Sequence, residues 1–266
     1  MKRGSIMNFP QKYLASCLLM ITALLCSSSP GGAQTAPNLG AAAAFEVLAG
    51  TAVTCTTSTV NGDVGAGIVV TETVCTITGE TVDGAATNQA IIDFTAAFTD
   101  LAGETCDSTL GASDLTGETI TPGIYCVNAA GATPPTGTLT LDAGGDPDAV
   151  FIFLVEGAFT GTGFNVVTTN GADPCNVYWQ VDAAATLTGS NFSGTILAGA
   201  AITLTDSILN GNAYAGAAVT LTDSVVNGCV PDDIPPPDPD ECPKPDPDEC
   251  PDDNGDKDHP ECKNDD

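Results

Sequence analysis

A short repeat in the second half of the chain constrains the fold more than any other feature. Three related units fill residues 183–228, and the tripeptide Thr-Leu-Thr begins at Thr186, Thr203 and Thr220, each 17 residues after the last. Self-similarity at a fixed period is the signature of a solenoid. A unit of this length is too short for a pair of helices, and its Gly, Asn and Asp residues suit corners between short strands. The repeat therefore predicts a β-helix.

Within each unit, apolar and polar residues alternate strictly. Leu187, Leu204 and Leu221 are each flanked by two threonines, which is the two-residue period of a strand with one buried face. If the coils stack in register, the leucines lie inside and the threonines form two outer columns. Neighbouring threonines would then be about 4.7–4.9 Å apart between strands and roughly 6.8 Å apart along a strand. The predicted grid consists of Thr186, Thr188, Thr203, Thr205, Thr220 and Thr222.

Residues 1–33 form a predicted secretory signal peptide. Three basic residues precede the apolar run from Leu14 to Leu25, and Gly31 and Ala33 fit a small-residue cleavage site. The apolar run is too short to span a membrane comfortably. A lipid anchor on Cys26 is disfavoured, because the preceding residue is leucine rather than a small residue. We expect a secreted protein, found in the medium or at the cell surface.

Residues 231–266 form a predicted acidic tail rich in Pro and Asp. The sequence PDPDECP occurs twice, starting at Pro237 and Pro245. Such a segment cannot bury enough apolar surface to offset the entropy of ordering it, and its prolines favour an extended form. We therefore expect a disordered but stiff tail that follows a solenoid domain spanning residues 34–230.

The predicted solenoid domain contains no Lys, Arg or His. Basic side chains are the usual partners of phosphate groups, so this composition argues against binding to nucleic acids and anionic membranes. Histidine is the commonest general base. A polysaccharide-active enzyme built on carboxylates alone would lack the base and charge stabiliser that lyase chemistry uses. We predict a protein that is not an enzyme and has neither a cofactor nor a metal site.

The cysteines indicate disulfides, because an exported chain reaches an oxidising compartment. The solenoid domain has six, which allow 15 connectivities. Proximity in the sequence favours the pairs Cys55–Cys75 and Cys106–Cys126. The tail has an odd number, so one cysteine stays free or pairs with a second chain, which would give a disulfide-linked dimer. The tail cysteines are Cys242, Cys250 and Cys262.

One segment departs from the strand pattern. Between residues 84 and 102 the apolar residues Ile91, Phe94, Phe98 and Leu101 follow helical spacing, and Gly103 supplies a stop. A helix of this length is marginal in isolation, so its apolar stripe must pack on something. At 1.5 Å per residue it spans roughly 27 Å, the height of about five or six stacked strands. The spacing predicts a helix lying alongside the solenoid.

Several segments together resemble the ice-binding-like family of secreted bacterial, archaeal and fungal proteins. They include NLGAAAAFEVLAG, ATNQAIIDFTAAFTDLAG, GTLTLDAGGDPDAVFIF, PCNVYWQV and NFSGTILAGAAITLTDSILNG, and the similarity runs from about residue 38 to 228. The resemblance implies a discontinuous, right-handed β-solenoid of triangular cross-section, with one long helix packed alongside. It also implies an activity, adsorption to ice through a flat face of the solenoid.

Some family members carry a T-A/G-x-T/N motif on that face. It occurs at TAVT (51–54), TGET (78–81 and 116–119), TGFN (162–165) and TGSN (188–191), whereas AAIT at 200–203 and AAVT at 217–220 lack the first threonine. The resemblance therefore adds Thr51 and Thr54 to the six threonines of the repeat as candidate ice-binding residues.

Threonine suits an ice-binding surface, because its hydroxyl can anchor water while its methyl is apolar and its χ1 is stiff. The main hypothesis is thus a secreted ice-binding protein with antifreeze or ice-recrystallisation-inhibiting activity. The alternative is a structural or adhesive surface protein without affinity for ice, whose threonines are simply good strand formers. Asp206 and Asp223, which follow the repeat strands, are predicted to form corners.

Overall fold

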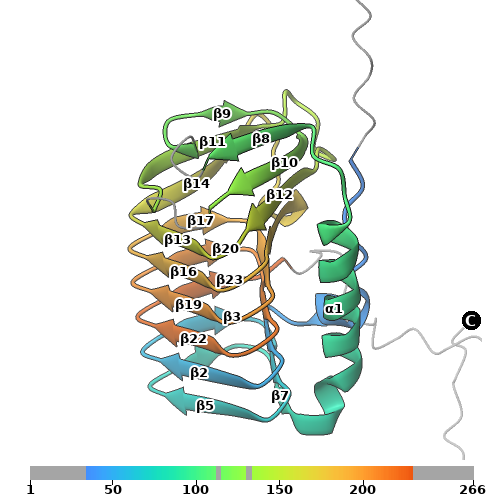
Figure 1. The fold of residues 1–266 in the computed structure, drawn as a ribbon. Helices are drawn as coiled ribbons and strands as arrows, with labels where there is room; N and C mark the ends of the chain where they lie inside the picture. The colour runs from blue at the N-terminus through green and yellow to red at the C-terminus, as the bar shows by residue number, and fades with distance from the viewer. Residues whose placement is uncertain (1–33, 112–114, 130–133, 230–266) are drawn as a thin grey trace, which may run out of the picture. The chain divides into compact units, whose positions relative to one another are not determined.

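The computed structural model describes residues 34–111, 115–129 and 134–229. The predicted signal peptide and acidic tail lie outside these residues. The described chain is a stack of short parallel strands with one α-helix beside it (Figure 1). Among the described residues, no helix is long and apolar enough to cross a membrane. The fold is the predicted solenoid.

Three sheets form the sides of the lower coils. The helix-side sheet contains, in spatial order, β7 (Thr81–Asp83), β4 (Val64–Ala66), β1 (Val47–Ala49), β21 (Ala213–Ala215), β18 (Thr195–Ala198), β15 (Val177–Val181), β12 (Phe151–Glu156), β10 (Gly123–Asn128) and β8 (Ser108–Gly111). The threonine sheet contains β13 (Phe159–Thr162), β16 (Ala185–Thr188), β19 (Ile202–Thr205), β22 (Val219–Thr222), β2 (Ala52–Thr56) and β5 (Val69–Thr73).

The asparagine sheet contains β17 (Asn191–Ser193), β20 (Ile208–Asn210), β23 (Val225–Asn227), β3 (Thr59–Asn61) and β6 (Thr76–Ile77). A three-stranded sheet of β14 (Phe164–Thr169), β11 (Gly137–Asp142) and β9 (Thr119–Ile120) belongs to the upper part of the stack. Each coil from the one that contains β16 to the one that contains β5 contributes one strand to the helix-side sheet, one to the threonine sheet and one to the asparagine sheet. The cross-section of these coils is therefore triangular.

The coils do not follow one another in chain order. β1 lies between β21 and β4, while β2 and β3 pair with β22 and β23. The chain therefore starts inside the stack and runs to the end formed by β5, β6 and β7. It returns along the outside as α1 (Asn88–Ala102) and begins again at β8 (Figure 1). This is the discontinuous solenoid that the family resemblance implied.

The helix packs on the outward side of the helix-side sheet. Its buried residues Ala90, Phe94, Ala97 and Leu101 form an apolar cluster with sheet residues. The sheet residues include Leu48, Ile152, Tyr178, Leu197 and Tyr214. The predicted helix over 84–102 begins instead as a 3-10 turn, η2 (Gly84–Thr87).

The 3-10 turn has a physical cause in two residues. Gly84 has a φ of 66°, which belongs to the left-handed region. The buried Thr87 hydroxyl donates to the carbonyl oxygens of Gly84 (2.9 Å) and Ala66 (3.2 Å) and so ties the turn to β4. Two further 3-10 segments, η1 (Gly40–Ala44) and η4 (Pro174–Asn176), lie before β1 and β15.

The interior is filled by the inward residues of every sheet. Leu187, Leu204 and Leu221 are 0 % exposed, as the alternation predicted. Trp179 is also fully buried and stacks on Phe153 at a centroid distance of 3.9 Å. Trp179 is therefore a packing residue of the core.

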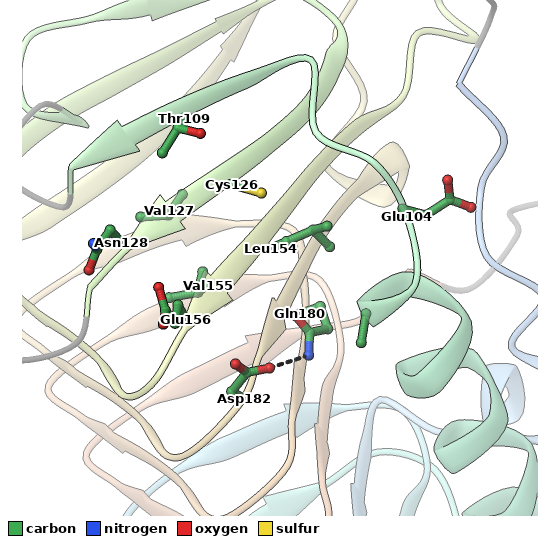
Figure 2. Close-up of a pocket in the computed structure, with 11 residues that line it drawn as sticks. Glu104, Thr109, Cys126, Val127, Asn128, Leu154, Val155, Glu156, Gln180 and Asp182 are labelled. Carbon is green, nitrogen blue, oxygen red and sulfur yellow. Dashed lines mark hydrogen bonds between the residues drawn. The ribbon is translucent and has the colours of Figure 1, made fainter.

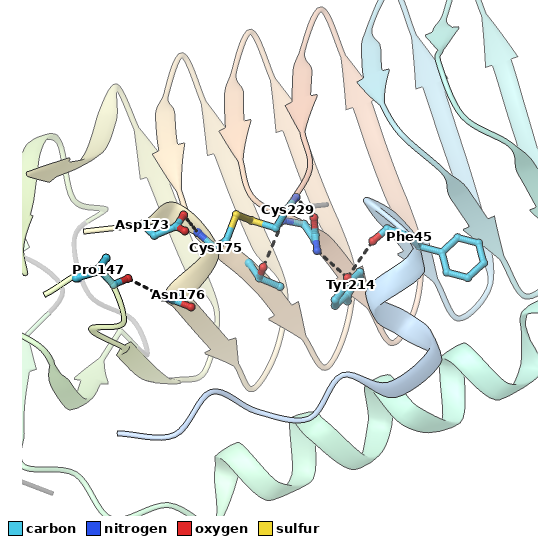
Figure 3. Close-up of a disulfide and its surroundings, with 9 residues drawn as sticks. Phe45, Pro147, Asp173, Cys175, Asn176, Tyr214 and Cys229 are labelled. Carbon is cyan, nitrogen blue, oxygen red and sulfur yellow. Dashed lines mark hydrogen bonds between the residues drawn. A yellow bond between two sulfur atoms is a disulfide. The ribbon is translucent and has the colours of Figure 1, made fainter. Parts of the chain in front are cut away.

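Within the described residues, three disulfides tie the coils together. Cys55–Cys75 and Cys106–Cys126 are the predicted pairs, and Cys175–Cys229 is the third. Figure 3 shows that the third disulfide continues into a polar chain. The Cys229 N–H donates to Asn212 Oδ1 (2.8 Å), Asn212 Nδ2 donates to the Tyr214 hydroxyl (2.8 Å), and that hydroxyl donates to the Phe45 carbonyl oxygen (2.9 Å). The chain links the end of the last coil to the segment that leads into β1.

A buried carboxylate lies at the seam between the first and last coils. The Glu46 N–H donates to the Asp63 carbonyl oxygen (3.0 Å), its carbonyl oxygen accepts from the Ala213 N–H (2.8 Å), and its carboxylate accepts from the Asp63 N–H. A Cβ at Gly62 or Gly228 would overlap this side chain, so both positions require glycine. Burial raises the pKa of the Glu46 carboxyl, because the ionised form loses its hydration.

Candidate functional site

The outward side of the threonine sheet carries two unbroken columns of threonine. Strand pairing is in register across the whole sheet, so each outward threonine lies beside another. The first column is Thr160, Thr186, Thr203, Thr220, Thr54 and Thr71. The second is Thr162, Thr188, Thr205, Thr222, Thr56 and Thr73. These twelve residues are called the threonine face below.

Small residues border most of the first column of the threonine face. Ala184, Ala201, Ala218 and Ala52 stand two positions before the first-column threonines and are half-buried. One position earlier, backbone hydrogen bonds align Thr51 with the column of Ala200 and Ala217 at the corner. Thr51 therefore borders the face, whereas the other seven predicted threonines lie on it.

The corner after the second column is built from residues in the left-handed region. Asp206 and Asp223 have φ values of 50° and 49°, so the predicted corner role is confirmed. Gly163, Gly189, Thr57 and Val74 hold the equivalent places, with φ values from 48° to 60°. The Thr57 hydroxyl donates to Asp223 Oδ1 across the seam.

A buried serine ladder fixes this corner from inside. The hydroxyls of Ser190, Ser207, Ser224 and Ser58 each donate to the carbonyl oxygen of the second-column threonine two residues earlier, at 2.8–3.2 Å. The Ser207 hydroxyl also accepts from the Ser190 N–H (3.2 Å), and the Ser224 and Ser58 hydroxyls accept in the same way from the preceding serine of the ladder. The ladder thus ties the coils of β16, β19, β22 and β2 to one another.

The structure adds five threonines to those predicted. They are Thr160, Thr162, Thr56, Thr71 and Thr73. Their strands read TGT, TCT and TET instead of Thr-Leu-Thr. Because the central leucine is missing, these strands were not identified as equivalent to the repeat. The signal that would have found them is T-x-T with any inward residue.

The motif matches fall on different parts of the solenoid. TAVT (51–54) leads into the threonine face. TGFN (162–165) and TGSN (188–191) form the corner after its second column, because Gly163 and Gly189 have backbone φ angles in the left-handed region. TGET at 78–81 lies between β6 and β7, and TGET at 116–119 leads into β9. The motif therefore does not mark a single face in this chain.

A pocket of about 310 Å³ lies on the outward side of the helix-side sheet, where α1 ends (Figure 2). It is lined by Glu104, Glu156 and Asp182 together with apolar residues such as Leu154, and Gln180 Nε2 donates to Asp182 Oδ1 (3.0 Å). No group of three or more His, Cys, Asp or Glu residues in the described ranges could hold a metal ion. The pocket thus offers carboxylates without a cationic or histidine partner.

The fold and the threonine face define a β-solenoid with one periodic side whose outward columns carry no charge. Sequence comparison identifies its family. The profile of the ice-binding-like family matches residues 31–227, and the chain belongs to this family.

Several relatives are known by name. An ice-binding protein of Nostoc sp. (strain HG1) is 34% identical over 200 residues, which are 73% of this chain and 72% of that protein. Ice-binding protein 1 of Shewanella frigidimarina (strain NCIMB 400) is 47% identical over 73 residues, which are 26% of this chain and only 8% of that protein.

Solved structures have the same fold. The ice-binding protein from the Antarctic ascomycete Antarctomyces psychrotrophicus gives a TM-score of 0.68 at 33% identity, covering 72% of this chain and 98% of that one. The DUF3494 domain of the Shewanella frigidimarina protein gives 0.64 at 28% identity, covering 72% and 97%.

Proposed function

We propose that this chain is an exported ice-binding protein that adsorbs to ice through the threonine face, and so limits ice growth or recrystallisation. The observation that carries the proposal is the two-column array of threonines on one in-register sheet. Six strands give five steps of about 4.8 Å, so each column is roughly 24 Å long. The relatives named as ice-binding proteins support the same function.

Binding to ice depends on the number of contacts and on the rigidity of the surface that makes them. Ice offers neither charge nor a pocket, so a binder needs many weak contacts at regular spacing. Threonine is stiff at χ1, and its strand neighbours restrict it further. A surface that is already ordered loses little entropy on binding. The disulfides and the serine ladder supply that order.

The test is ice recrystallisation and crystal shape under a microscope, with the purified protein and its disulfides intact. We expect slowed coarsening and faceted crystals. Thr205→Tyr places a bulky ring in the middle of the second column and should lower the activity several-fold. Thr59→Tyr is the matched control, because Thr59 is a half-buried outward threonine on the asparagine sheet. Equal activity of the two variants would show that the ice-binding surface is not the threonine face.

Round crystals that coarsen normally at high protein concentration would reject ice binding. That result would favour the alternative function, a structural or adhesive protein at the cell surface. We propose no enzymatic activity in either case, because residues 34–230 contain no Lys, Arg or His to supply the base and charge stabiliser of lyase chemistry.

We also propose that residues 1–33 direct export and that residues 231–266 form an acidic tail. One of Cys242, Cys250 and Cys262 joins two chains or remains free. Electrophoresis without reducing agent separates these outcomes, because a covalent dimer runs at twice the monomer mass.

A further inference from the structure

One end of the solenoid is formed by the coil of β5, β6 and β7, residues 69–83. Each of these strands is the last in its sheet, so its outer edge has no strand partner among the described residues. Unpaired edges are templates for strand addition by another chain. This end also exposes apolar side chains, because Ile68, Val69 and Val74 are 67%, 41% and 81% exposed. A second copy of this chain has edges of the same kind and is the natural partner for such an end.

The inward residues of this coil differ from those of the coils above it. On the threonine sheet, Glu72 pairs with Cys55 and occupies the inward column of Leu187, Leu204 and Leu221. Cys55 and the three leucines are 0% exposed, whereas Glu72 is exposed. The column therefore changes from apolar to charged at its last position.

The same change occurs on the helix-side sheet. Thr81 pairs with Val64, and Asp83 pairs with Ala66, and both partners belong to the buried core. The Thr81 hydroxyl donates to Glu72 Oε1 (3.4 Å), which joins the two sheets across the end of the core. Val70 pairs with Val53 and Ile77 pairs with Val60, so both continue apolar inward columns and pack against the core at this end of the solenoid. The end coil thus presents a mixed, partly charged surface where its neighbour presents an apolar one.

We propose that residues 69–83 form a polar end cap that prevents a second copy of this chain from adding strands to the free end of the solenoid. Docking of a second copy would bury the carboxylates of Glu72 and Asp83. The solenoid domain has no Lys, Arg or His to pair with them, and burying an unpaired carboxylate is strongly unfavourable. An inward charge on an edge strand is a known protection against edge-to-edge association.

The test restores the pattern of the neighbouring coils. The triple variant Glu72→Leu, Thr81→Val, Asp83→Ala copies residues found in the same columns one coil or more away. Sedimentation velocity of the full chain measures association, and electrophoresis without reducing agent accounts for any covalent dimer through the tail. We expect the triple variant to form a non-covalent dimer or larger assembly, while the wild type does not. Glu80→Ala, which removes an exposed carboxylate at a corner of the same coil, should behave like the wild type.

Hydrogen exchange locates the contact. Amide exchange in residues 69–83 should slow as the concentration of the triple variant rises, while exchange in the coil of β16 and β17 stays constant. If the triple variant misfolds, Glu72→Leu alone decides the question, because the exposed site tolerates the change. It should raise the association constant at least about tenfold, the effect of one modest favourable contact.

Three results would overturn the end-cap proposal. The folded triple variant could stay monomeric, or Glu72→Leu could associate no more than the wild type when the triple variant misfolds. The wild type itself could also associate through residues 69–83. All of these readouts are independent of ice, so the end cap can fail while the ice-binding proposal stands, and the reverse.

Discussion

The serine ladder makes a quantitative prediction for Ser207→Ala. The Ser207 hydroxyl donates to the Thr205 carbonyl oxygen (2.8 Å) and accepts from the Ser190 N–H (3.2 Å). Ser207 is 2% exposed and its bond from Ser190 is buried. The alanine variant leaves that N–H without a partner in a site that excludes water. An unsatisfied buried donor costs about 1–3 kcal/mol, so we expect a loss of about 2 kcal/mol in the free energy of unfolding.

Thermal unfolding followed by circular dichroism measures this loss. For a domain of this size, 1 kcal/mol corresponds to about 2–4 °C, so the midpoint should fall by about 4–8 °C. Ser108→Ala is the matched control, because Ser108 is an exposed serine on the edge strand β8. A change below about 0.5 kcal/mol for Ser207→Ala, the usual range for surface substitutions, would refute the reasoning.

Three further predictions test the corner, the seam and the third disulfide. Asp206→Gly should leave stability unchanged or raise it by up to about 1 kcal/mol in denaturant unfolding, because glycine adopts the left-handed region freely; a clear loss would contradict this. The raised pKa of Glu46 means that the folded state favours the protonated carboxyl, so stability is lost as pH rises from the ordinary carboxyl pKa of 4.5 through the folded pKa. Glu46→Gln should therefore melt higher than the wild type at neutral pH and lose this dependence, and a lower midpoint would count against the assignment. Replacing Cys175 and Cys229 with serine opens a link of sequence separation 54 and should cost about 4 kcal/mol by the loop-entropy estimate, measured by denaturant unfolding; an unchanged midpoint would show that the link adds nothing.

The sequence predicted the parts of the fold that repeat locally. Leu187, Leu204 and Leu221 follow one another at a constant period, so one strand assignment determined the inward and outward columns of three coils. The helix was predicted because its apolar spacing differs from that of the strands around it. Its first turn was missed, since a hydrogen bond from Thr87 to Ala66 in β4 holds that turn in 3-10 form, and no local pattern reports such a contact.

The order of the coils was beyond a reading of the residues alone. β2 pairs with β22 although Thr54 and Thr220 are far apart in the chain. Only the family resemblance implied a discontinuous solenoid. The repeat by itself predicted only three of the six strands of the threonine face, and the motif added Thr54 of β2. The inward residue differs in every coil outside the repeat, being Gly161 in β13, Cys55 in β2 and Glu72 in β5.

The seam between β22 and β2 lies within the threonine face, so the face is continuous only if this junction is as regular as the others. Two interactions continue the pattern across it. The Ser224 N–H donates to the Ser58 hydroxyl (3.0 Å), as within the repeat, and the Thr57 hydroxyl donates to Asp223 at the corner. Glu46 closes the opposite side of the same junction, because its carbonyl oxygen accepts from the Ala213 N–H (2.8 Å) and its side chain packs against Gly228. The four threonines contributed by β2 and β5 therefore extend the eight above them because serine, aspartate and glutamate side chains hold the junction between chain-distant coils at the spacing of a normal coil.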